Sequence, residues 1–205
     1  MTDILSAAHT LLIGSDSNFQ GSIASELALT KLARGHNVIQ LVDDQGEANS
    51  ALSKTMIWSK ARLVPADLLR GFHAAVGKQF KSAEDLAGTI DDRLSLADRD
   101  KPLTILRDLS RQTLPVFPGH PWLEMASALA DILDAQIVTA ASYGSGPAPN
   151  FKDYCANRIW RVEASPNLKV ELTPVRPSTG NPITFEGKDH SGIILWNEQK
   201  EPAHV

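Results

Sequence analysis

The chain has 205 residues, of which 42% are hydrophobic and 21% charged, so it is long enough for one domain with a full core and its composition shows no sign of long disorder. The net charge of −4 gives no support to holding nucleic acid by bulk electrostatics, which needs clustered lysine and arginine. The single cysteine, Cys155, excludes an internal disulfide, and neither a Cys/His metal motif nor a membrane-spanning apolar run is present, so we expect a cytoplasmic protein with no metal site and no membrane contact.

The first forty residues have the pattern of a β-strand, a helix and a second strand. An apolar run at residues 9–13 predicts a buried strand that ends at Gly14. After a polar loop, helical spacing of apolar residues predicts a helix from Ser22, with Gly21 or Ser22 as its N-cap. Residues 37–42 predict a second buried strand. Such a unit is expected to be parallel and right-handed.

The middle of the chain continues the alternation of helices and strands. Helical stretches are expected near residues 47–60, 65–80 and 82–97, and no chemistry is assigned to them. Core strands are expected at residues 103–106 and 136–141, with a proline-rich extended segment at 112–121 and a further helix between them. This order predicts an α/β fold with a mostly parallel sheet and helices on both faces.

The end of the chain changes character. Short alternating segments separated by turn residues predict an antiparallel extension of the sheet, at residues 158–163, 168–173, 183–186 and 192–196. We expect residues 1–196 to form a single domain and residues 197–205 to be a flexible polar tail.

The loop after the first strand is the first candidate site. Ligands of open α/β sheets bind beyond the carboxyl ends of the strands, and backbone N–H groups at a helix N-terminus attract anions. The loop at 14–22 is therefore a candidate site for an anionic or nucleotide-like group, although it is equally well a tight connection in a βαβ unit. The candidate binding residues are Gly14, Ser15, Asn18, Gln20, Gly21 and Ser22.

The order of these features resembles the RecA-like ATPase core, in the branch of KaiC-type proteins, DnaB-type replicative helicases and recombinase paralogues. The resemblance covers residues 8–196 and includes the Gly14 loop, the acidic end of the second strand and the final hairpin module at 169–193. It implies a RecA-like, mostly parallel central sheet flanked by helices, with a C-terminal antiparallel hairpin extension.

The phosphate loop departs from the pattern of that family. A working loop reads G-x-x-x-x-G-K-[ST], because the lysine reaches the β- and γ-phosphates and the hydroxyl holds Mg²⁺. Aligned on Gly14, this chain has Phe19, Gln20 and Gly21 in place of the glycine, the lysine and the hydroxyl residue. Loss of the lysine removes a charge from a site whose catalysis is mainly electrostatic, and Ser22 is left as a displaced hydroxyl.

Other positions of the family's site are carried over by the resemblance. It places Asp44 at the activating carboxylate after the second strand. The metal-supporting aspartate falls on Arg107, or on Asp108 after a shift of one residue. Arg176 matches the arginine that reaches a neighbouring subunit's nucleotide, while Pro174 replaces the accompanying lysine.

Each of these residues also has a purely structural interpretation. The aspartates after the second strand are equally expected to cap a loop, Arg107 and Asp108 to form a local ion pair, and Arg176 to lie on a solvated hairpin. Trp160 and Trp196 are expected to be packing residues, and His120 in the proline-rich segment is the histidine of most interest.

The hypothesis drawn from these observations is a catalytically degenerate RecA-like subunit, a pseudo-ATPase. It acts by assembly with itself or with a RecA-like partner, and the resemblance implies DNA recombination, repair or replication. One alternative is an active NTPase binding ATP or ADP with Mg²⁺ through Ser22, Asp44 and Asp108, with Lys31 or Lys54 entering the site. The other is a Rossmann-like enzyme that binds a nucleotide-sugar or flavin.

Overall fold

A computed structural model of the chain describes residues 4–5, 7–15, 19–76, 80–94, 98–110 and 116–199. In chain order, the described residues form β1 (His9–Gly14), α1 (Phe19–Leu32), β2 (Asn37–Val42), α2 (Gln45–Ala61), the 3₁₀ turn η1 (Leu68–Gly71), β3 (Phe72–Val76), α3 (Ala83–Arg93), β4 (Leu103–Asp108), α4 (Pro121–Leu133), β5 (Gln136–Ser142), the 3₁₀ turn η2 (Phe151–Asp153), β6 (Arg158–Ser165), β7 (Lys169–Arg176), β8 (Ile183–His190) and β9 (Ile193–Glu198).

All of these strands join one nine-stranded sheet in the order β3-β2-β4-β5-β1-β6-β7-β8-β9. The pairs from β3 to β6 are parallel, and those from β6 to β9 are antiparallel. This is the mostly parallel α/β sheet with a C-terminal antiparallel extension that the sequence predicts. One detail differs, because β6 pairs in parallel with β1 on its other edge and so belongs to both parts.

The strand order contradicts the Rossmann-like alternative. A Rossmann sheet places the second strand directly beside the first. Here β4 and β5 lie between β1 and β2, although both strands run in the same direction. The first β-strand, helix and second strand therefore form a parallel unit that spans two inserted strands, and the Rossmann-like alternative is wrong.

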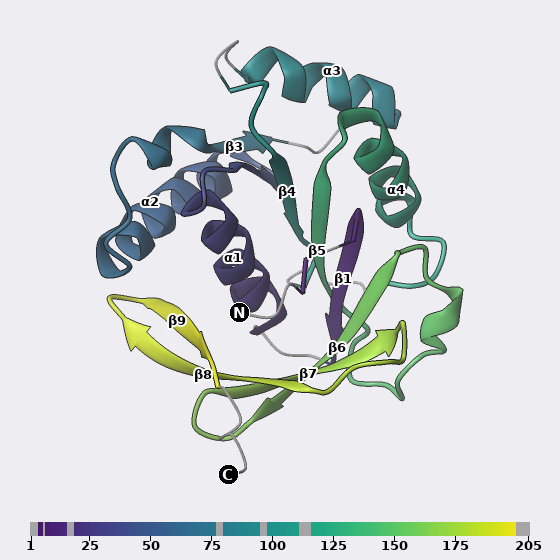
Figure 1. Cartoon of the computed structure of the whole chain (residues 1–205). Helices are drawn as coiled ribbons and strands as arrows, with labels where there is room; N and C mark the ends of the chain where they lie inside the picture. Colours follow the sequence, from purple (N-terminus) through teal and green to yellow (C-terminus); the bar gives the residue numbers. More distant parts are fainter. Residues whose placement is uncertain are drawn as a thin grey trace.

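Helices cover both faces of the parallel part of the sheet (Figure 1). α1 and α2 pack on one face of the sheet over one cluster of buried hydrophobic residues. α3 and α4 pack on the other face over a separate cluster. Alternate residues of a strand enter opposite clusters, as the two-residue period of a β-strand requires. On β1, Leu11 and Ile13 enter the α3–α4 cluster and Leu12 enters the α1–α2 cluster.

The α1–α2 cluster extends under the C-terminal strands. Val170, Phe185 and Trp196 are buried in it together with residues of α1. Strands β8 and β9 therefore curl around the same face of the sheet that α1 and α2 cover, and the turn between them lies beside α2 (Figure 1).

Three local expectations need correction. Residues 65–80, predicted to be helical, contain a 3₁₀ turn and the edge strand β3. The first helix begins at Phe19, so Gly21 and Ser22 lie within its first turn and neither is its N-cap. Strand β9 runs to Glu198, beyond the expected start of the tail at residue 197. Residues 200–205 lie outside the described part.

Candidate functional site

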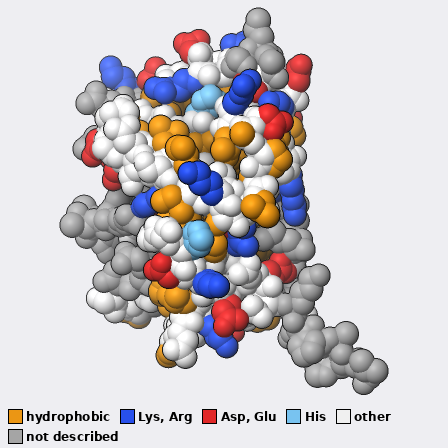
Figure 2. Space-filling model, turned by 90° about the vertical axis from the view of Figure 1, so that its left-hand side faces the viewer, with side chains coloured by type: hydrophobic (Ala, Val, Ile, Leu, Met, Phe, Trp, Pro, Cys, Tyr) orange, Lys and Arg blue, Asp and Glu red, His pale blue; other side chains and the backbone are white. Residues whose placement is uncertain are grey.

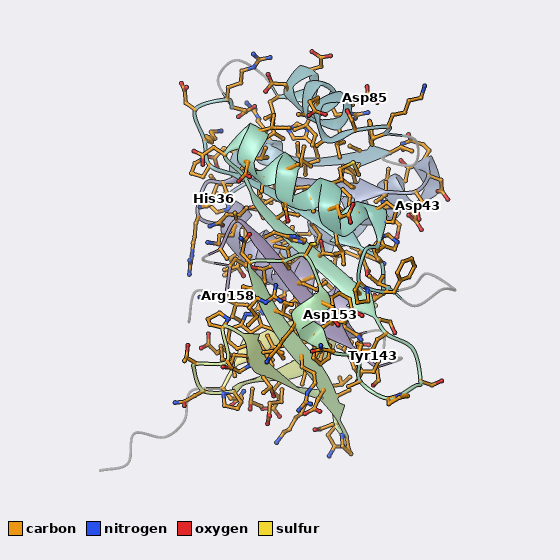
Figure 3. The ribbon with its side chains drawn as sticks, turned by 90° about the vertical axis from the view of Figure 1, so that its right-hand side faces the viewer. His36, Asp43, Asp85, Tyr143, Asp153 and Arg158 are labelled. Atoms are coloured by element: carbon orange, nitrogen blue, oxygen red, sulfur yellow. The ribbon has the colours of Figure 1, made fainter. Side chains whose placement is uncertain are left out.

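The carboxyl ends of the parallel strands gather the candidate residues at one edge of the sheet. Asp43 follows β2 and Tyr143 follows β5, and Figure 3 shows both on the same side of the molecule. His36 precedes β2 and lies on the opposite side (Figure 3). Gly14, Ser15 and the first turn of α1 belong to the same edge as Asp43, which is where ligands of such sheets bind. Asn18, also a predicted binding residue, lies outside the described residues.

Gln20 takes the place of the lysine and points back into the loop. Its Nε2 donates to the Ser15 carbonyl at 2.7 Å, and the residue is 0% exposed. A Cβ on Gly14 would lie 2.6 Å from the same Nε2, so a side chain at position 14 would collide with this amide. The amide therefore ties the two ends of the loop together without supplying a positive charge.

Gly21 and Asp108 are packed against each other. A Cβ on Gly21 would lie 2.0 Å from Oδ2 of Asp108, a distance that real atoms do not adopt. Oδ1 of Asp108 accepts from the Ser110 amide at 2.9 Å and from its hydroxyl at 2.6 Å, which fixes the carboxylate. As expected, the loop after β1 meets the end of β4. The Asp108 carboxylate, however, occupies the space that the family's hydroxyl side chain would need at position 21.

Arg107 pairs with Asp43 across two neighbouring strands and not with Asp108 as expected. Its guanidinium donates to Oδ1 of Asp43, and the residue is buried. His120 lies nearby: burial lowers its pKa, and the charge of Arg107 lowers the pKa further. Its Nδ1 accepts from the Trp122 amide at 3.2 Å and so caps α4. Asp43, Arg107 and His120 thus each have a hydrogen-bond partner within the chain.

Asp44 caps a helix. Its side chain accepts from the Glu47 amide at 2.9 Å, in the N-cap position of α2. Glu47 in turn accepts at 2.8 Å from the amide of Asp43, the residue before the N-cap, in a variant of the capping box. The interaction that the structure assigns to Asp44 is therefore structural, and an activating role for it stays a prediction.

The hydroxyl of Ser22 is used by the C-terminal hairpin. It accepts from Nε1 of Trp196 at 2.7 Å, and the Trp196 ring meets the Phe19 ring edge-on with centroids 5.6 Å apart. Sequence reasoning treats Trp196 only as a packing residue and does not foresee this contact with the loop. A residue so distant in the chain gives no local signal of such a bond.

An ion pair between the buried Glu26 and the half-buried Arg62 fixes the same hairpin to α1 and to the end of α2. Arg62 contacts Oε1 of Glu26 at 2.8 Å and donates to the Trp196 carbonyl at 2.6 Å. The other oxygen of Glu26 accepts from the Trp196 amide at 3.2 Å. Burial raises the pKa of Glu26, and the charge of Arg62 with these hydrogen bonds opposes that rise. None of these roles was predicted from the sequence.

Arg176 is held by its own chain. Its guanidinium donates to the carbonyls of Tyr154 at 2.9 Å and Ala156 at 3.0 Å, and also to that of Lys152. These bonds position the 3₁₀ turn η2 beside β7. The intersubunit role that the resemblance implies for Arg176 is still a prediction.

The residues present do not fit a magnesium-bound nucleotide in the manner of the family. Gln20 has no charge, Gly21 has no hydroxyl, and Ser22 is bonded to Trp196. Lys31 lies in the last turn of α1, about 16 Å along the helix from Gln20. Among the described residues, no group of three or more His, Cys, Asp or Glu is arranged to hold a metal ion.

A scan of family models and a search of curated proteins find no match to the sequence. Solved structures do match. An ATPase domain aligns with a TM-score of 0.62 at 12% identity, over 91% of this chain and 84% of that one. A DnaB-like replicative helicase, solved for its interactions with primase, aligns with a TM-score of 0.63 at 10% identity, over 91% of this chain but 58% of the helicase. The RadB recombinase aligns with a TM-score of 0.56 at 14% identity, over 89% and 88% of the two chains.

These similarities define the class of fold. The chain has the RecA-like fold of P-loop ATPases, as the sequence resemblance predicted, at identities that establish the fold alone. No helix among the described residues is long and apolar enough to cross a membrane.

Proposed function

We propose that this protein is a catalytically inactive RecA-like subunit that works by assembling with copies of itself or with a RecA-like partner. The observation that carries the proposal is the buried Gln20, whose amide bonds to Ser15 inside the loop where an active enzyme holds a lysine. Catalysis of phosphoryl transfer depends on charges that stabilise the transition state. A neutral amide in that position removes one of them.

The surroundings of Gln20 support the same conclusion. Replacing Gln20 by lysine would restore the charge alone. Residue 21 would still be a glycine without a hydroxyl, and Asp108 would still be packed against it. The Trp196 indole also remains bonded to Ser22. The loop is thus supported by side chains that hold its shape, which suits a scaffold better than a site that must admit Mg²⁺ and a triphosphate.

Assembly is supported by apolar side chains that no described element covers. Leu52 and Met56 lie four residues apart on α2 and are 43% and 56% exposed, so they share one face of the helix. Leu63 follows the end of α2, is 88% exposed and has a backbone φ of 55°. Figure 2, which views the side at the left of Figure 1, shows hydrophobic side chains gathered across the middle of that face with lysine and arginine side chains among them.

The process that the fold neighbours indicate is DNA replication or recombination, since one of them is a replicative helicase and another a recombinase. We therefore propose a partner that is itself a RecA-like protein of that machinery. The net charge of −4 favours contact with such a protein over direct binding of DNA.

Phosphate release from Mg-ATP tests the catalytic half of the proposal. We expect wild-type protein and the Gln20→Lys variant both to release phosphate at the rate of a protein-free blank. Release that scales with protein concentration and is lost in Asp108→Ala would contradict the proposal and favour the active NTPase.

Sedimentation velocity tests the assembly half. We expect wild-type protein at about 10 μM, alone or mixed with a RecA-like partner, to sediment faster than a monomer, and Leu52→Glu/Met56→Glu to lose that association. Replacing the exposed Lys60 of the same helix by Glu is the matched control. A chain that stays monomeric in every mixture would refute assembly.

A further inference from the structure

A cavity of about 600 Å³ lies between α1 and α2 and borders the first turn of α1. The C-terminal half of β2 forms its floor, and the turn between β8 and β9 closes one side with Gly192 and Ile193. Apolar wall is supplied by Leu29, Ala51 and Trp58. This volume lies within the range of about 300–1,000 Å³ that holds small molecules in proteins.

Several polar groups line the cavity without a hydrogen bond to the described part of the chain. They include the Gln40 amide, the Ser50 and Thr55 hydroxyls and the Lys54 ammonium group. Thr55 is only 4% exposed as a residue, and its side chain faces the cavity. Since small-molecule sites combine an apolar lining with a few polar groups that fix the ligand, a hydroxyl and an amide that face one cavity in this way indicate a ligand that bonds to both.

The charges are arranged along the cavity. At the sheet edge, Asp43 is paired with Arg107, and Glu47 and Asp108 also line the cavity. Glu26 lines it too, and its charge is paired with Arg62. Lys54 lies seven residues beyond Glu47 on the same helix, about 10 Å further along its axis. One end therefore suits a hydrogen-bond donor and the other a single anionic group. A triphosphate, with several negative charges against one lysine, does not match this arrangement.

We propose that this cavity binds a flat aromatic molecule that carries a donor group at one end and a single anionic group at the other. The aromatic body lies against Leu29, Ala51 and Trp58, the anion meets Lys54, and the Gln40 amide and Thr55 hydroxyl bond to the polar edge. Free aromatic acids and nucleoside monophosphates are two classes of molecule that combine an aromatic body with a donor group and an anionic group.

Fluorescence titration with 8-anilinonaphthalene-1-sulfonate tests the proposal, because this probe has an aromatic body, an N–H donor and one sulfonate. We expect one saturable site whose affinity falls on the order of tenfold in Lys54→Glu, as for the loss of one charge pair. Lys60→Glu, which changes an exposed lysine of the same helix that does not line the cavity, should bind as wild type does. Thr55→Val should weaken binding by a smaller factor at nearly constant volume.

Competition with adenosine monophosphate then separates the two sources. Displacement of the probe identifies a nucleoside monophosphate site, and retention of the probe excludes that class and leaves free aromatic acids as the proposed ligand. Ala51→Trp, which fills the cavity, should abolish probe binding. The proposal is overturned by the absence of saturable probe binding to wild-type protein, or by equal affinity in Lys54→Glu, Lys60→Glu and wild type.

Discussion

Glycine at position 21 is required by its neighbour, whereas glycine at position 88 is not. A Cβ at Gly21 would meet the fixed Asp108 carboxylate at 2.0 Å, while a Cβ at Gly88 has no atom within 4 Å. Both residues lie in helices, where alanine is intrinsically favoured over glycine by roughly 0.5–1 kcal/mol. The same substitution should therefore have opposite effects at the two positions.

We expect Gly21→Ala to lower the free energy of unfolding by about 1–3 kcal/mol, as overpacking does, and Gly88→Ala to raise it by about 0.5–1 kcal/mol. Urea unfolding measures both. The double variant Gly21→Ala/Asp108→Ala should recover most of the loss because it removes the colliding carboxylate. A Gly21→Ala protein as stable as wild type would show that Asp108 is not held against the first turn.

His9 makes the stability of the fold depend on pH. Burial lowers its pKa to about 4, and its ring nitrogens lie 3.1 Å from Oγ1 of Thr139 and 3.4 Å from Oγ of Ser127. The unfolded chain, with a histidine pKa near 6.5, binds the proton more readily between pH 6.5 and pH 4. Stability is therefore retained above pH 6.5 and lost as the pH falls through this window.

The free energy of unfolding should fall by about 2 kcal/mol between pH 7 and pH 5 through His9 alone. Replacing His9 by Gln should flatten this part of the profile, and replacing the exposed His190 should leave it unchanged. Denaturant unfolding at both pH values is the measurement. An equally steep fall in His9→Gln would assign the pH dependence to other groups.

At the scale of elements, the attachment of β9 to α1 and α2 depends on one charged pair. Removing Arg62 leaves Glu26, which is 4% exposed, without its cation, and takes away the bond to the Trp196 carbonyl. We expect Arg62→Ala to cost about 3 kcal/mol at pH 8. The loss should shrink near pH 5, because the raised pKa of Glu26 rises further without Arg62 and the carboxyl group becomes neutral.

Thermal unfolding of Arg62→Ala and of Arg62→Ala/Glu26→Gln at both pH values checks this explanation. The double variant carries neither charge of this pair, so its stability should be higher than that of Arg62→Ala at pH 8 and should change little with pH at this site. Equal instability of both variants at pH 8 would mean that Arg62 acts through packing and not through Glu26.

The elements themselves differed in how well the sequence predicted them. Strands β1, β2, β4 and β5 are buried on both faces, so their continuous apolar runs predicted them closely. Strand β3 is short, lies at the edge and is only partly buried, so its sequence has neither an apolar run nor a clear alternation. α1 begins earlier than predicted, at Phe19, whose ring packs against Trp196, and local sequence does not encode this contact.

At the scale of the molecule, the sequence predicted which segments carry the site but not how they are joined. The loop at Gly14, the first turn of α1 and Asp108 come together as expected because all lie at the carboxyl edge of parallel strands. The partners were not predictable: Arg107 pairs with Asp43, and Ser22 bonds to Trp196, 174 positions away. Side-chain pairing across a sheet depends on strand order, which spacing in the sequence does not specify.

A single sheet also predicts that the molecule unfolds as one unit. The tryptophans lie in α2 (Trp58), α4 (Trp122), β6 (Trp160) and β9 (Trp196), and each is buried. Because β9 is bonded to α1 through Glu26 and to α2 through Arg62, the antiparallel extension should not unfold before the parallel part. We expect far-ultraviolet circular dichroism and tryptophan fluorescence to give coincident urea transitions. A fluorescence change that precedes the loss of secondary structure, and that disappears in Trp196→Phe, would instead divide the chain into two unfolding units with the boundary at the C-terminal strands.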